Sequence, residues 1–169
     1  MTSVFYNSEG ATEALAKTVL AELPREAVYL CIGTAKVVSD SLGPIIGTKL
    51  IEKMKRPVFV YGLANANITA INLERAYELI KQIHPDRKIV VIDSAVGDLE
   101  QVGEIQLSDG GIVPGAATNK NLSKIGDKNI VGIVSEKGLG DFYATTSNKI
   151  ALVEKMAELI SSAIAQAYS

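Results

Sequence analysis

Short apolar runs that alternate with segments of helical period constrain the fold of this chain more than any other feature. Residues 27–32 are continuously apolar, which is typical of a strand covered on both faces. Strands are expected at three places: residues 27–32, 57–63 and 88–92. Helices are expected where apolar residues recur at helical spacing: residues 10–23, 42–54 and 68–83. This alternation predicts parallel strands joined by right-handed helical crossovers.

Residues with special backbone properties mark the ends of these helices. Pro24 ends the first helix, and Pro44 is compatible with the first turn of the second. Asn65 and Asn67 are expected to cap the third helix, which ends before His84 and Pro85.

The second half of the chain does not continue the regular alternation of strands and helices. Residues 102–107 alternate like a strand with one solvated face, a turn follows at 108–111, and a further strand is expected over 129–134. Residues 147–167 form a final helix, whose apolar side chains suit a core or an interface between copies equally. The long loop between residues 110 and 126 is rich in Gly, Asn and Pro. It is either a segment that covers a substrate or an ordered surface excursion.

These patterns predict one α/β domain over residues 1–169. We expect a three-layer, doubly wound, mostly parallel sheet with helices on both faces. The length and the 47% hydrophobic content suit one globular domain with a full core.

Charge and composition argue against several classes of partner. The net charge of -2 and the lack of a basic run do not favour nucleic acid. No apolar segment is long enough to span a bilayer, and the N-terminus does not have the pattern of a signal peptide. The single cysteine, Cys31, excludes an internal disulfide and fits a cytoplasmic compartment.

Two aspartates each follow a buried strand. Asp40 comes shortly after the first strand, and Asp93 ends the third. Ligands of open parallel sheets bind at the carboxyl ends of the strands, so the two side chains converge if these strands are neighbours. Taken singly, Asp40 also suits the N-cap of the helix that follows, and Asp93 suits a turn.

A converging carboxylate pair supports hydrolytic chemistry. Two close carboxylates share one proton, which supplies an acid and a base, or they hold a divalent cation that activates water. Thr34 and Asn67 are expected to line the site, and Asn119 and Lys120 to bind substrate from the long loop.

Other catalytic signatures are missing. No Gly-x-Ser-x-Gly elbow occurs, and Gly33-Thr34 lacks the spacing of a nucleotide-binding loop. One histidine, His84, and one cysteine do not make a zinc site of the usual composition.

Five segments in order resemble the sporulation protein YyaC family. They are Cys-Ile-Gly-Thr at 31–34, Ser-Asp-Ser-Leu-Gly-Pro-Ile-Ile-Gly-Thr-Lys-Leu at 39–50, Ile-Asp-Ser-Ala at 92–95, Gly-Ile-Val-Pro-Gly-Ala at 111–116 and Asn-Lys at 119–120. That family is similar in turn to the germination protease of spore-forming bacteria and, more distantly, to hydrogenase maturation endopeptidases.

The resemblance implies an endopeptidase in which Asp40 and Asp93 are catalytic. The implied partner is a protein or peptide, with small acid-soluble spore proteins as candidates, cleaved in the cytoplasm of a forespore. In the hydrogenase maturation endopeptidases, matching acids help to bind nickel together with a histidine, but no histidine of this chain matches. Ala35 also stands where the YyaC-like pattern has an acid. The alternatives are therefore a binding protein that has lost the reaction and a hydrolase of small amides or esters.

Overall fold

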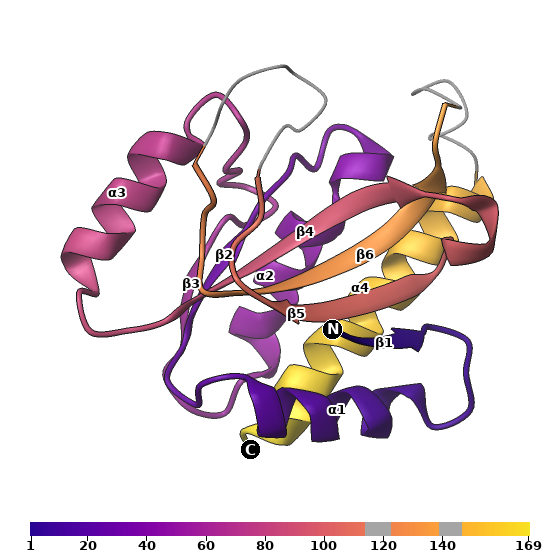
Figure 1. Cartoon of the computed structure of the whole chain (residues 1–169), viewed down its shortest axis with the longest axis horizontal. Helices are drawn as coiled ribbons and strands as arrows, with labels where there is room; N and C mark the ends of the chain where they lie inside the picture. Colours follow the sequence, from indigo (N-terminus) through magenta and orange to yellow (C-terminus); the bar gives the residue numbers. More distant parts are fainter. Residues whose placement is uncertain (114–122, 139–146) are drawn as a thin grey trace.

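A computed structural model describes residues 1–113, 123–138 and 147–169 of the chain (Figure 1). The strands are β1 (Thr2–Phe5), β2 (Val28–Cys31), β3 (Phe59–Tyr61), β4 (Ile89–Gly97), β5 (Glu104–Asp109) and β6 (Lys128–Glu136). The α-helices are α1 (Ala11–Glu22), α2 (Leu42–Lys53), α3 (Leu73–Ile83) and α4 (Ser147–Ala167). Two short 3-10 helices are η1 (Val38–Asp40) and η2 (Leu99–Gln101).

The strands form one mixed, mostly parallel sheet in the order β1-β5-β6-β4-β2-β3. The four strands β3, β2, β4 and β6 are mutually parallel. At the other side, β5 pairs antiparallel with both β6 and β1. The predicted fold class is therefore confirmed, and the alternating segment in the second half belongs to the antiparallel part.

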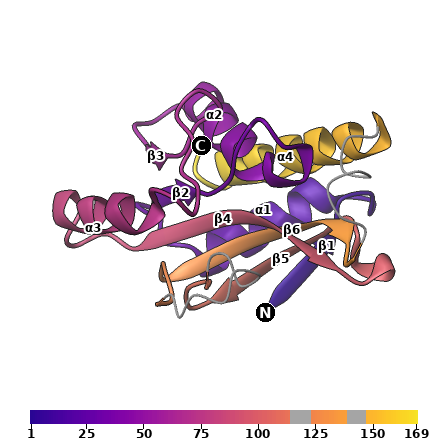
Figure 2. The ribbon, with the colours of Figure 1, turned by 90° about the horizontal axis from the view of Figure 1, so that it is seen from above.

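Helices cover both faces of the sheet. One apolar cluster joins α1, α2 and α4 to side chains such as Tyr29, Ile92 and Ile130, and Figure 2 shows these three helices on the same side of the strands. A second cluster joins α3, through Leu73 and Ile80, to the other face, and Figure 1 shows α3 apart from the other helices. Among the residues described, no helix is both long enough and apolar enough to cross a bilayer.

The expected start of the third helix is wrong because tertiary contacts override a local signal. The third helix begins at Leu73 and not at residue 68, so Asn65 and Asn67 do not cap it. Instead, Leu63 and Ala66 exchange backbone hydrogen bonds, and Ile68 forms a bridge with Ile32 at the end of β2. The chain is thus held in extended and turn conformations before the helix starts.

The sheet also contains more strand than the apolar runs indicate. No strand was expected at Thr2–Phe5, a short edge strand that forms by pairing with β5. The strand expected to end at residue 92 continues to Gly97, because β6 pairs with it from Val90 to Gly97. Asp93 therefore lies inside β4 and not after it.

Candidate functional site

The neighbouring strands β2 and β4 mark the topological switch point of the sheet. From β2 the chain passes through α2 to β3 on one side, whereas the chain after β4 continues to β5 and β6 on the other. In open α/β sheets, ligands bind at the carboxyl ends of the strands at such a point. The segment after β2 and the second half of β4, which carry the predicted aspartates, meet there.

Asp40 ends η1, in the loop that connects β2 to α2. Its Oδ2 accepts a hydrogen bond of 3.1 Å from the backbone N–H of Thr34, and its carbonyl oxygen accepts one of 2.8 Å from the same group. The residue at the N-cap of α2 is Ser41, which makes no side-chain capping bond. Asp40 therefore turns back toward the end of β2, where its carboxylate is partly buried.

Two glycines allow this loop to fold tightly against the strand. Gly33 has a φ of 136°, and a Cβ placed on it would lie 2.1 Å from the carbonyl oxygen of Asp40. A Cβ on Gly43, in the first turn of α2, would lie 2.2 Å from the carbonyl oxygen of Ile32. Because neither approach leaves room for a side chain, both glycines are required for the position of Asp40.

Asp93 lies one residue beyond the last pair of β2 and β4, which joins Cys31 to Ile92. It is partly buried, and its Oδ1 accepts a hydrogen bond of 2.8 Å from the N–H of Ser94. That bond to the adjacent N–H is local, as expected for a turn-forming aspartate, although the residue is part of a strand.

The environment of Asp93 favours its neutral form. The pKa of Asp93 is raised to about 7 as the net result of three effects: desolvation by burial raises it most, the Ser94 N–H lowers it, and the charge of Asp40 raises it. The two carboxyl groups therefore lie close enough to influence each other electrostatically, and Asp93 exchanges its proton near neutral pH.

A hydrogen bond joins the two segments that carry the aspartates. The Oγ of Ser94, next to Asp93, donates to the carbonyl oxygen of Ser39, next to Asp40, at 2.8 Å. Sequence reasoning did not assign a role to Ser94. The sequence does place a serine directly beside each aspartate, but a hydrogen bond between these two segments can be predicted only when the neighbouring strands are known.

Of the predicted substrate-binding residues, Thr34 lies in the loop that carries Asp40, and Asn67 contacts this loop. The N–H of Thr34 binds Asp40, and its Oγ1 accepts a hydrogen bond from the N–H of Lys36 at 3.2 Å. The Oδ1 of Asn67 accepts a hydrogen bond of 3.4 Å from the N–H of Ala35. Asn119 and Lys120 lie outside the described residues.

The donor atoms near the switch point do not match a nickel site made of acids and a histidine. Across residues 1–113, 123–138 and 147–169, no three side chains of His, Cys, Asp or Glu gather into a metal-binding group. His84 ends α3 before β4 begins, at the opposite edge of the sheet, and its Nε2 lies 2.8 Å from Tyr61 Oη. A divalent ion held by Asp40 and Asp93 would need its other ligands from water or substrate.

The pair of carboxyl groups can supply both halves of acid–base catalysis. Two interacting carboxyl groups titrate as a unit, so that one keeps a proton while the other is ionised. A proton donor and a proton acceptor at one place can polarise a carbonyl group and activate a water molecule.

Comparisons with known proteins show the family and the fold of this chain. Residues 3–163 match the family described as "Protein of unknown function (DUF1256)". The "Uncharacterized protein YyaC" of Bacillus subtilis (strain 168) is 30% identical over 159 residues, which cover 91% of this chain and 78% of that protein. The crystal structure of a [NiFe] hydrogenase maturation protease, HycI from Thermococcus kodakarensis KOD1, is similar with a TM-score of 0.53 and 18% identity. The match covers 90% of this chain and 99% of HycI, and at that identity it shows a shared fold.

Proposed function

This chain belongs to the DUF1256 family, and we propose that it is an endopeptidase in which Asp40 and Asp93 share one proton. The observation that carries the proposal is the meeting of the two aspartate segments at the switch point, where a Ser94–Ser39 hydrogen bond of 2.8 Å joins them and where burial, with a smaller contribution from the Asp40 charge, raises the pKa of Asp93 to about 7. A fold shared with a hydrogenase maturation protease supports the same class of reaction by analogy.

The reaction follows from the different surroundings of the two aspartates. Asp93 keeps the proton and donates it to the carbonyl oxygen of the scissile peptide, while the Asp40 carboxylate takes a proton from the attacking water. The water oxygen bonds to the carbonyl carbon and gives a tetrahedral diol. When the C–N bond breaks, the proton on Asp40 goes to the leaving nitrogen, and a diol hydroxyl returns a proton to Asp93.

The substrate proposed for this site is a protein segment. Small acid-soluble spore proteins of a forespore are the first candidates, by resemblance to the germination protease. Thr34 and Asn67 line the proposed site, and Asn119 and Lys120 are proposed to bind substrate.

A cleavage assay with matched variants tests the proposal. The purified chain is incubated at neutral pH with a small acid-soluble spore protein and with an unfolded general substrate, and fragments are identified by mass spectrometry. We expect D40N and D93N to abolish cleavage while circular dichroism shows a folded protein. D86N, a control at an exposed aspartate at the far edge of the sheet, should cleave like the wild type. Retained cleavage in D40N and D93N would exclude the assignment.

A second candidate function is a protein that binds the same segment without cleaving it. The observation that favours it is Ala35, which stands where the YyaC-like pattern has an acid and whose N–H donates a hydrogen bond to Asn67 Oδ1. In that case, the wild type leaves every substrate intact, and D40N and D93N retain its affinity for the intact substrate in calorimetry.

A further inference from the structure

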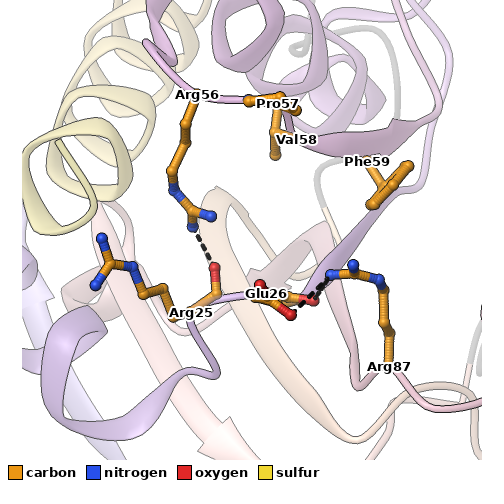
Figure 3. A pocket seen from close by; sticks show the side chains of 8 residues that line it. Arg25, Glu26, Arg56, Pro57, Val58, Phe59 and Arg87 are labelled. Carbon is orange, nitrogen blue, oxygen red and sulfur yellow. Dashed lines mark hydrogen bonds and ion pairs between the residues drawn. The ribbon is translucent and has the colours of Figure 1, made fainter.

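Three of the four arginines of this chain line one hollow. Arg25, Arg56 and Arg87 surround a space of about 280 Å³ together with Glu26, Ala27, Pro57, Val58 and Phe59 (Figure 3). The fourth arginine, Arg75, is exposed on α3 and does not line it. In a chain with a net charge of -2, this concentrates positive charge at one place.

The topology explains why residues so far apart in the sequence meet. Arg25 precedes β2, Arg56 precedes β3 and Arg87 precedes β4. Because these three strands are parallel neighbours, their amino ends lie along one edge of the sheet. The hollow is therefore at the edge opposite to Asp40 and Asp93, and it is separate from the proposed peptidase site.

Arg56 has hydrogen-bonding capacity that the protein does not use. One of its terminal nitrogens donates to the carbonyl oxygen of Arg25, but its Nε is buried and finds no partner among the residues described. Buried donors are nearly always paired in native proteins, so this unpaired donor is available to a bound anion once the Arg56 guanidinium turns toward the hollow.

Arg87 approaches from the other side and is only loosely neutralised. Its Nη1 lies 2.9 Å from the carbonyl oxygen of Glu26 and 3.5 Å from the Glu26 carboxylate, whose side chain is 74% exposed. Figure 3 shows the Arg56 and Arg87 guanidinium groups pointing toward the backbone of residues 25 and 26, while Arg25 extends outward. An anion with more charge than Glu26 could displace this exposed carboxylate.

Apolar groups form the remaining wall. Pro57, Val58 and Phe59 line the hollow, and the Arg87 guanidinium lies 4.8 Å from the centre of the Phe59 ring. The space is at the small end of ligand sites. A matching ligand therefore combines an anionic group with a small apolar body.

We propose that this hollow binds the phosphate group of a small ligand between Arg56 and Arg87, with Arg25 contributing charge. Guanidinium groups recognise phosphate through paired N–H donors. A phosphate presents enough oxygens to meet two arginines at once, whereas a carboxylate has only two. The proposal does not depend on the peptidase hypothesis.

Calorimetry on the full chain tests this site with two probes. Inorganic phosphate and phenyl phosphate are titrated at constant ionic strength, in a buffer without phosphate or sulfate, because salt screens such contacts. We expect both to bind, and phenyl phosphate more tightly because its ring packs against Phe59 and Pro57. Equal affinities for the two probes would indicate that the site binds free phosphate. A higher affinity for phenyl phosphate would indicate that it binds phosphomonoesters. Both results support a phosphate site.

Matched substitutions distinguish this site from diffuse attraction. R56Q and R87Q should each weaken phenyl phosphate binding about tenfold or more, because each removes charge-assisted hydrogen bonds. E26Q should strengthen binding, because it removes the competing carboxylate. R75Q makes the same change of charge outside the hollow and should leave the affinity unchanged.

Three results would overturn the proposal: no binding of either probe at millimolar concentration, equal weakening by R75Q, or unchanged affinity in both R87Q and E26Q. Circular dichroism shows whether each variant is folded. If R56Q fails to fold, the opposite effects expected for R87Q and E26Q still decide the question.

Discussion

The Ser94 hydroxyl donates a hydrogen bond of 2.8 Å to the carbonyl oxygen of Ser39, and this bond connects the two segments that carry Asp93 and Asp40. It joins β4 to η1, which are far apart in the sequence and adjacent at the switch point of the sheet. The relative position of the two carboxyl groups therefore depends on a contact that neither aspartate makes itself.

The first prediction concerns this bond. S94A removes one partly buried hydrogen bond, so the free energy of unfolding should fall by about 1 kcal/mol in urea denaturation. Any peptidase activity should fall with it, because Asp40 is no longer held beside Asp93. S39A is the control and should be near the wild type in both, since only the backbone of Ser39 takes part. Equal effects of S39A and S94A would contradict this role.

The second prediction is a pH dependence of stability caused by Asp93. An unfolded aspartate ionises near pH 3.9, whereas the folded pKa is about 7. Between these values the folded state keeps a proton that the unfolded state has lost, so this group destabilises the fold progressively as the pH rises. The loss is on the order of 1 kcal/mol per pH unit within that window.

D93N removes this titration and isolates its contribution. Its free energy of unfolding relative to the wild type should increase from about pH 4 to about pH 7 and then level off. D93N should thus be more stable than the wild type at neutral pH, although it is expected to be inactive. D86N, measured by the same urea titrations, should follow the wild-type curve. Parallel curves for D93N and the wild type would show that Asp93 is not perturbed.

The third prediction concerns Gly33. G33A places a Cβ 2.1 Å from the carbonyl oxygen of Asp40 at a φ of 136°, so we expect a loss of more than about 2 kcal/mol of stability. G110A is the control, since Gly110 has a φ of 79° with nothing within 4 Å of an added Cβ. G110A therefore introduces backbone strain without a steric clash, and it should lower the free energy of unfolding by only about 1 kcal/mol. Similar losses in the two variants would argue against a steric role for Gly33.

The fourth prediction concerns the attachment of the C-terminus. The hydroxyl of the buried Tyr168 donates to the carbonyl oxygen of Leu23 at 2.7 Å and lies 3.2 Å from that of Val19. Y168F leaves these buried carbonyl groups with one partner fewer, so thermal or urea unfolding should reveal a loss of about 1–3 kcal/mol. Y6F is the control, because the Tyr6 hydroxyl makes no hydrogen bond to the described residues. An unchanged stability of Y168F would mean that water replaces the hydroxyl.

The parallel strands of this protein and the helices that cover them can be predicted from the amino-acid sequence alone. The apolar run that forms β2 and the helical spacing of apolar residues in α2 and α4 are local patterns. They predict these elements without knowledge of which other segments lie beside them. The presence of Asp40 and Asp93 after such runs was readable for the same reason. Asn67 misled the prediction, because its capping tendency is weaker than the pairing of Ile68 with Ile32.

Which distant residues meet depends on the assembled sheet. β1 exists because β5 offers it a partner, and β4 extends through Asp93 because β6 runs beside it. The Ser94 to Ser39 bond and the gathering of Arg25, Arg56 and Arg87 follow from strand order, which no short segment encodes. Hydrogen bonds and electrostatic interactions act between neighbours in space, so the chemistry of both sites appears only once the sheet is assembled.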